Sequence, residues 1–213
     1  MSKNELDKVL KKKFILCDCE TGGTDSRFSL LSAHFSHLSD NMEIVSSLDL
    51  KFRPDNGIFV IMPEAMDINK IDLADHEKNG VSYYEGYRTF SKFEQEDPRR
   101  KDMQCNYHED YEDVYTLVGW NIGYDIEFLK RHLFDNCVTQ YEDSFSYTSF
   151  DVKSIAINLQ NLGLIPEELK LSLGNLANHF NIDASKAHNA REDCILTLKV
   201  LEKLNQLILT QRK

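Results

Sequence analysis

The fold is decided by residues 13–23, which read KFILCDCETGG. The apolar first half of this stretch is typical of a strand that is buried on both faces in the middle of a sheet. Successive side chains of a strand point to opposite faces, so Asp18 and Glu20 share one face while Cys17 and Cys19 share the other. The sequence predicts a central strand that ends in two acids. Taken alone, two solvated acids at a strand tip explain the pattern better, because Asp and Glu are frequent in this chain.

The segments around this strand alternate between strand and helix patterns. Strands are predicted over 28–37 and 43–52, and Pro63 favours the start of a short helix. A short strand over 116–120 precedes a helix over 121–133. Helical stretches are also expected after Ile165 and after Ser172, and a long amphipathic helix over 189–209. This order predicts an α/β fold in which a mixed central sheet is flanked by helices.

Length and composition indicate a single globular domain. The 213 residues are 41% hydrophobic, which excludes a disordered chain. Residues 1–213 are predicted to form one domain with an elaboration at about 75–118, where six of the nine tyrosines lie and no helix or strand period is evident. The five cysteines show no CxxC spacing and are interpreted as thiols.

The net charge and the lengths of the apolar runs indicate which partners and which cellular compartment to expect. With 35 acidic and 25 basic residues, the formal charge of −10 argues against a broad basic surface for a phosphate backbone. No apolar run is as long as a membrane span, so no membrane partner is expected. The charged N-terminus lacks the apolar stretch of a signal peptide, and we expect a cytoplasmic protein.

Two further segments combine acids with helix signals. Asp125 lies about 60° from the apolar stripe of its predicted helix, where an acid needs a partner or a metal, and Asn121 is a candidate N-cap. The spacing of Asn189 and Glu192 predicts a second helix start, which leaves His188 just outside and Asp193 one turn inside. The Asp125 segment alone is equally compatible with a capped helix and an exposed acid, and for the His188 segment alone a surface histidine beside a normally capped helix is the more common explanation.

Together the three segments resemble the motifs of the DEDD 3′→5′ exonucleases, in the subgroup whose last motif contains histidine. The first motif is matched by Asp18-x-Glu20-x-Gly22, the second by Gly119-Trp120-Asn121-x-x-x-Asp125 and the third by His188-x-Ala190-x-x-Asp193. The resemblance implies a ribonuclease H-like fold and hydrolysis of the 3′-terminal phosphodiester of single-stranded DNA or RNA, with DNA favoured, releasing nucleoside 5′-monophosphates. The sequence departs from the family in the longer 75–118 segment and in Trp120, where histidine is frequent.

The predicted site is a cluster of four carboxylates around divalent cations. Two like charges about 4 Å apart repel by about 4 kcal/mol at an effective dielectric of about 20, so the cluster needs compensation. Oxygen ligands favour Mg²⁺ or Mn²⁺. We expect two such ions and expect His188 to accept the proton of the attacking water. The expected metal ligands are Asp18, Glu20, Asp125 and Asp193, and the expected substrate contacts are Thr21, Gly22 and Asn121.

The sequence leaves other functions open. The chain could be an exoribonuclease that resembles oligoribonuclease or ribonuclease T, because no residue pattern reads the 2′-hydroxyl. It could also be a non-catalytic binding module that recruits a protein partner through 75–118, or a proofreading subunit that works with a polymerase. Retention of all four acids and of the histidine ranks the exonuclease first.

Overall fold

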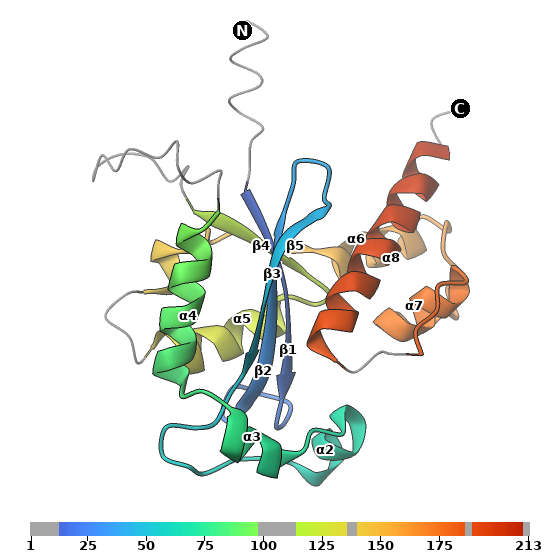
Figure 1. Ribbon diagram of the computed structural model, residues 1–213. Helices are drawn as coiled ribbons and strands as arrows, with labels where there is room; N and C mark the ends of the chain where they lie inside the picture. Colours follow the sequence, from blue (N-terminus) through green and yellow to red (C-terminus); the bar gives the residue numbers. More distant parts are fainter. Residues whose placement is uncertain (1–12, 98–113, 136–139, 186–188, 211–213) are drawn as a thin grey trace, which may run out of the picture.

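A five-stranded mixed sheet forms the centre of the molecule (Figure 1). The structure, a computed structural model, describes residues 13–97, 114–135, 140–185 and 189–210. The strands lie in the order β3-β2-β1-β4-β5, with β2 antiparallel to both neighbours and β4 parallel to both of its own. Their bounds are β1 (Lys13–Thr21), β2 (Leu30–Leu38), β3 (Ile44–Lys51), β4 (Tyr115–Gly119) and β5 (Phe150–Asp151). The α/β fold predicted from the sequence is confirmed.

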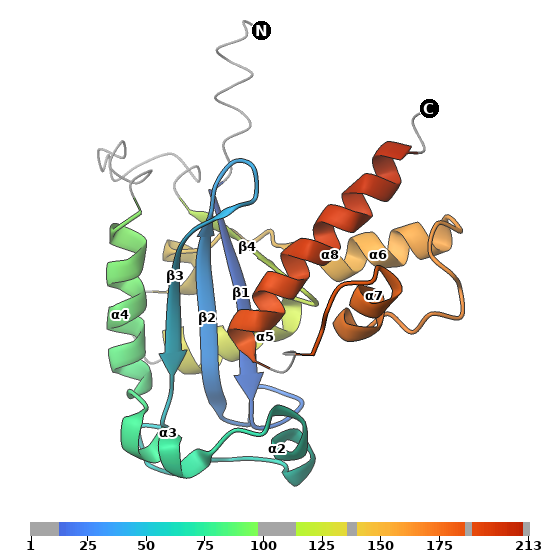
Figure 2. The ribbon, with the colours of Figure 1, turned by 45° about the vertical axis from the view of Figure 1, so that its right-hand side comes forward.

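Helices cover both faces of the sheet, and the two views in Figures 1 and 2 separate them. One face is packed against α4 (Tyr83–Gln95), α5 (Gly123–Phe128) and the π-helical turn η3 (Leu129–Phe134). The other is packed against α6 (Val152–Asn161), α7 (Leu173–His179) and α8 (Ala190–Thr210). At the end of the sheet where β1 ends lie α2 (Pro63–Asn69) and α3 (Leu73–Asn79), and the short 3₁₀ helix η4 (Tyr141–Asp143) follows η3 in sequence. Within the described ranges, no helix combines the length and the apolar character needed to cross a membrane.

Strand β1 takes the central position because its first half is apolar on both sides. Ile15 and Cys17 belong to the core on the α4–α5 face, whereas Leu16 belongs to the core on the α8 face. Asp18 and Glu20 continue the phase of Leu16, so their side chains face the α8 layer. The alternation that is apparent in the sequence therefore fixes the face on which the acids lie.

The prediction that the segment 75–118 has no helical period is wrong over α4, where Tyr83, Tyr87 and Phe90 recur at helical spacing and contribute to the core. Ser82 and Glu85 form a capping box that starts α4. Phe90 of this helix is fully buried, and its ring centroid lies 4.7 Å from that of Phe35 on β2. This part of the expected elaboration is thus a layer of the domain. Residues 98–113 lie outside the described ranges, and a protein partner for this segment remains a prediction.

Two helix boundaries differ from the prediction. Asn121 adopts a left-handed conformation, with φ of 60°, and its backbone N–H donates to Asp151 Oδ1 at 2.8 Å. Consequently α5 begins only at Gly123, and Ile122 at its N-cap position provides no side-chain cap. The predicted cap by Asn121 is therefore wrong.

The helix expected after Ile165 is absent from the described residues, and the next helix there is α7, which Ser172 caps. The side-chain amide of Gln160 donates to the carbonyl oxygens of Pro166, Glu167 and Leu169, which holds this segment in a turn. A contact between a side chain and carbonyl groups six to nine positions away has no periodic signature in the sequence.

Candidate active site

Asp18, Glu20 and Asp193 form one carboxylate cluster. One oxygen from each lies within 4.8 Å of the others. The first two acids project from the end of β1, and the third comes from the first turn of α8, which packs over the same face of the sheet. The structure thus brings together three of the four acids that the sequence predicts as metal ligands.

The N-terminus of α8 is fixed by Asn189. Its side-chain oxygen accepts hydrogen bonds from the backbone N–H groups of Arg191 (3.2 Å) and Glu192 (3.4 Å). The backbone carbonyl of Asn189 accepts the N–H of Asp193 at 2.9 Å. This cap is the one predicted from the sequence, and it places Asp193 in the first turn, where an acid is also favoured by the helix dipole. His188 precedes the cap in the sequence and lies outside the described residues.

Asp125 approaches the cluster from the opposite layer and bonds to the backbone of β1. Its Oδ1 accepts the N–H of Cys19 at 2.8 Å. The pairing of β4 with β1 extends only to Val118 opposite Leu16, so the carboxylate takes up a strand N–H beyond the end of β4. Asp125 is buried and is not part of the 4.8 Å group. The sequence analysis expects Asp125 to have a partner or a metal, and the structure gives it a backbone amide as its partner.

The electrostatics of the site disfavour ionised carboxylates. Burial raises the pKa of Asp18 well above its ordinary value, and the charges of Asp125, Asp193 and Glu20 raise it further. Burial, with the charge of Asp193, raises the pKa of Glu20 to about 7. Burial raises the pKa of Asp125 to about 8, although the N–H of Cys19 acts in the opposite direction. An all-oxygen group that resists ionisation in this way is chemically suited to a divalent cation, which would compensate the negative charge.

The three expected substrate contacts occupy different environments. Thr21 Oγ1 donates to the carbonyl of Gly23 at 2.9 Å and lies 2.7 Å from the hydroxyl of Tyr124. Both backbone groups of Gly22 are used inside the protein, the N–H to Ser29 and the carbonyl to Met62. A Cβ atom at Gly22 would lie 2.6 Å from the carbonyl oxygen of Val60, so the close approach of this loop requires glycine.

Asn121 is exposed in the turn that follows β4, and its side-chain oxygen lies 3.5 Å from Nζ of Lys153. The contacts of this side chain therefore point to Lys153 and not to the carboxylate cluster. Its role as a substrate contact stays a prediction.

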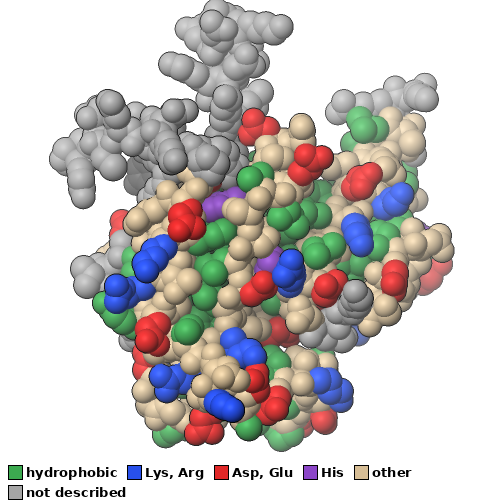
Figure 3. Space-filling view, in the orientation of Figure 1, with side chains coloured by type: hydrophobic (Ala, Val, Ile, Leu, Met, Phe, Trp, Pro, Cys, Tyr) green, Lys and Arg blue, Asp and Glu red, His purple; other side chains and the backbone are tan. Residues whose placement is uncertain are grey.

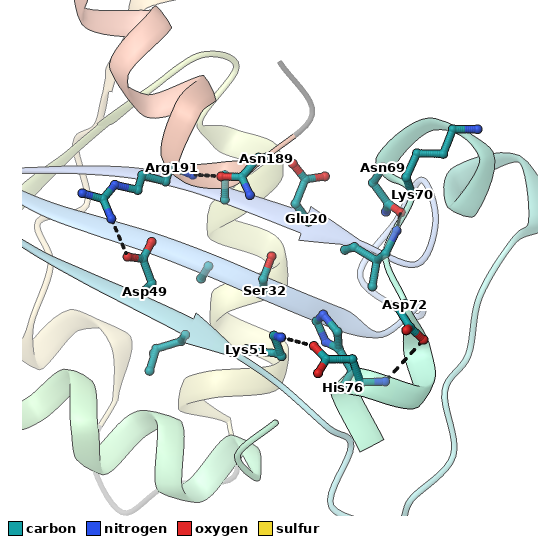
Figure 4. Close-up of a pocket in the computed structure, with 15 residues that line it drawn as sticks. Glu20, Ser32, Asp49, Lys51, Asn69, Lys70, Asp72, His76, Asn189 and Arg191 are labelled. Atoms are coloured by element: carbon teal, nitrogen blue, oxygen red, sulfur yellow. Dashed lines mark hydrogen bonds and ion pairs between the residues drawn. The ribbon is translucent and has the colours of Figure 1, made fainter. Parts of the chain in front are cut away.

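Two cavities meet at Glu20 and Asn69, which line both of them. The smaller has a volume of about 300 Å³ and is lined mainly by apolar or aromatic side chains of α2 and α5, among them Met62, Ile68 and Tyr124. The larger, of about 510 Å³, crosses the ends of β1, β2 and β3 beneath the start of α8 (Figure 4). Of the residues that line these cavities, the sequence analysis singled out Glu20, Thr21 and Asn189. It predicted no site residue in the segment of α2 and α3, where its one expectation was the helix start at Pro63.

A polar network on β2 and β3 lies beside the cluster and extends from the buried His34 to the exposed Asp49 and Arg191. His34 pairs in register with Asp18 on one side and with Asp49 on the other. Its Nδ1 lies 2.6 Å from Asp49 Oδ1, and its Nε2 lies 2.7 Å from Ser36 Oγ. Asp49 Oδ2 in turn lies 3.4 Å from a guanidinium nitrogen of Arg191 on α8. The network links β2 and β3 to the helix turn that carries Asp193.

The structure is similar to solved structures of Exonuclease I. It aligns with Escherichia coli Exonuclease I in complex with a dT13 oligonucleotide at a TM-score of 0.67 and 16% identity, over 95% of this chain and 43% of the other. With Exonuclease I from Methylocaldum szegediense the TM-score is 0.62 and the identity 19%, over 92% and 42% of the two chains. The chain shares the fold of Exonuclease I.

The covered length and the sequence comparisons limit what this structural similarity shows. The chain spans about two fifths of the length of the Exonuclease I chains that it matches. By sequence, it matches no protein-family model and no curated protein. An E. coli Exonuclease I–single-stranded DNA complex in its zinc-bound form aligns at a TM-score of 0.65 and 16% identity, over 94% of this chain and 42% of that one. The similarity establishes the fold, and the chemistry has to be argued from the residues.

The raised pKa values predict that the metal-free protein loses stability as the pH rises. The folded state binds protons at Glu20 and Asp125 that the unfolded state, with ordinary pKa values near 4, has released. The contribution of these two groups to the free energy of unfolding is therefore fully present below about pH 4. It is lost as the pH rises through about 7 for Glu20 and about 8 for Asp125. For Glu20 alone the loss is on the order of 3 kcal/mol, which is about 5 °C or more in thermal midpoint.

Thermal unfolding in EDTA between pH 5 and pH 8 measures this loss, in steps of about half a unit. Saturating Mg²⁺ should flatten the dependence, because a cation binds the deprotonated acids. Glu20→Gln should reduce the dependence in EDTA without abolishing it, because Asp125 still contributes, whereas Glu127→Gln, which changes an exposed acid of α5, should leave it intact. An identical slope in all four samples would contradict the electrostatic description.

Proposed function

We propose that the protein is a metal-dependent 3′→5′ exonuclease of single-stranded DNA that releases nucleoside 5′-monophosphates, of the DEDD subgroup with histidine in its last motif. The observation that carries this proposal is the convergence of Asp18, Glu20 and Asp193 from β1 and α8, which the first and third sequence motifs predict. The Exonuclease I fold supports the same assignment, since the structures that share it are described as complexes with dT13 and dA16 oligonucleotides.

The donor set fits a pair of divalent cations, Mg²⁺ or Mn²⁺. Asp18, Glu20 and Asp193 would hold them, with Asp125 as the fourth ligand that the motif resemblance implies. The oxygen-only composition and the raised pKa values of these acids support this assignment. Bound there, such ions would lower the pKa of the attacking water and stabilise the departing 3′ oxygen.

The protein groups around the cluster would bind and orient the terminal nucleotide. We assign the smaller cavity to the 3′-terminal nucleoside, because Met62, Ile68 and Tyr124 offer apolar and aromatic surface to a base. Thr21 lines the same cavity, next to the glycine turn that brings the backbone close. His188 would accept the proton of the attacking water, and Asn121 would orient the site.

An acidic chain is compatible with this function. Figure 3 shows acidic and basic side chains interspersed over the face in view, without a broad basic field. Affinity for a strand end would therefore come from the cation site and from a few local contacts, and not from the net charge of −10.

Incubation of 5′-labelled DNA and RNA oligonucleotides with Mg²⁺, Mn²⁺ or EDTA tests the proposal. We expect a ladder that shortens from the 3′ end of single-stranded DNA in either metal and no cleavage in EDTA. A faster ladder on RNA would reassign the substrate to RNA. Internal cuts would indicate an endonuclease, and intact substrate in every metal would contradict the proposed activity.

A further inference from the structure

The larger cavity is a trough whose floor is built by the ends of three strands (Figure 4). Glu20 on β1, Ser32 on β2 and Lys51 on β3 pair across the sheet in one row, with their side chains on the α8 face. The start of α8 borders one side of the trough, and the segment that joins α2 to α3 borders the other. The trough therefore begins at an acid of the carboxylate cluster and runs away from it across the sheet.

The linings of the two cavities differ in chemistry. Most residues that line the larger cavity carry polar or charged side chains, whereas the smaller one includes a group of apolar and aromatic side chains, namely Met62, Ala65, Ile68 and Tyr124. Because Glu20 lies at the boundary, a substrate whose reacting group sits at the cluster can extend into both cavities. The apolar cavity suits a base, and the polar trough suits a sugar and a phosphate.

Three cations from three elements line the trough, namely Lys51, Lys70 and Arg191. Lys51 forms an ion pair with Asp75, and Arg191 forms one with Asp49. These ion pairs fix the positions of Lys51 and Arg191 in the lining of the trough. An ammonium or guanidinium group still has N–H donors left after one such contact. Among the described residues, no ion pair engages Lys70 at the C-cap of α2.

Apart from Glu20, which belongs to the carboxylate cluster, the acids of the trough have partners in the protein. Asp49 bonds to His34 and Asp75 bonds to Asn79, in addition to their cations. Asp72 accepts the N–H groups of the first turn of α3. Their negative charge is partly compensated by these contacts, so the remaining donors of the cations can bind an anion.

We propose that the trough is a second substrate subsite, which binds the penultimate nucleotide of single-stranded DNA through its 5′-phosphate. This inference rests on the proposed function, since the carboxylate cluster defines the position of the scissile bond. The terminal nucleoside then occupies the apolar cavity, and the leaving strand passes over Ser32 toward Lys51 and Lys70.

Two dinucleotides isolate this contact: TpT ends at the penultimate sugar, whereas pTpT carries the 5′-phosphate that the trough would bind. For the wild type we expect kcat/KM on pTpT to exceed that on TpT by about tenfold, the effect of one charge-assisted contact. In the double variant Lys51→Gln/Lys70→Gln this ratio should fall below about twofold. The control Lys78→Gln removes an exposed lysine of α3 that does not line the trough, and it should keep the full ratio.

Binding of a labelled single-stranded oligonucleotide in EDTA gives a second reading that does not depend on turnover. The slope of log K against log salt should fall by about 0.7 for each phosphate contact that the variant loses. If the wild type cleaves both dinucleotides and the double variant keeps its ratio and slope, the subsite is wrong while the proposed function stands. If the wild type cleaves neither dinucleotide, the ladder on labelled oligonucleotides decides the proposed activity and the salt slope decides the subsite, which an unchanged slope in the double variant overturns.

Discussion

Asp18→Asn is expected to reduce kcat on single-stranded DNA by at least about 10³-fold, since it removes a charged group on which transition-state stabilisation depends. The same variant should unfold at a higher temperature than the wild type in EDTA near neutral pH. Asp18 carries a pKa well above its ordinary value because it is buried beside three other acids, so its ionised form opposes folding when no cation is present. Loss of activity combined with a gain in stability separates a functional acid from a structural one.

Glu127→Gln is the matched control for this experiment, because it removes an exposed acid on α5 without touching the cluster. It should retain the activity and the thermal midpoint of the wild type. Wild-type turnover in Asp18→Asn, from protein purified free of contaminating nuclease, would contradict the metal assignment. A large loss of stability in Asp18→Asn would indicate that Asp18 supports the fold directly.

The part of the site that could be predicted from sequence is the part that local periodicity fixes. The two-residue period of β1 determines that Asp18 and Glu20 share a face, and the Asn189 cap determines that Asp193 lies in a first helical turn. Both are consequences of backbone geometry within a few residues. Their convergence, in contrast, depends on the packing of α8 over β1, which the motif resemblance supplied and the structure now shows.

The remaining features depend on contacts between distant segments. Asp125 bonds to Cys19 only because β4 ends early, and the link between His34 and Asp49 exists only when β2 and β3 pair in this register. Helix α4 is a different case, because its signal is local: Ser82 and Glu85 have capping-box spacing, and Tyr83, Tyr87 and Phe90 recur at helical spacing. The sequence analysis missed it by interpreting the tyrosine-rich segment as an elaboration without a helical period.

The second large effect is expected for His188→Ala, which should lower kcat by about 10²- to 10⁴-fold, the usual contribution of a general base. His188 is next in sequence to Asn189, whose side chain caps α8, and it is five positions before Asp193. In the wild type the rate should fall as the pH is lowered, because a protonated imidazole cannot accept the proton of the water. In the variant the rate should instead continue to rise with pH, because hydroxide replaces the missing base.

A pH–rate profile between about pH 5.5 and pH 9, at saturating Mg²⁺, distinguishes this role from a structural one. Lost binding alone would raise KM and leave the shape of the kcat profile unchanged, whereas a missing base changes the shape itself. His179→Ala, which removes an exposed histidine at the end of α7, controls for the loss of an imidazole as such. If His188→Ala shows the rate and the profile of the wild type, the proton has another acceptor, and the acids of the cluster become the groups to test for that role.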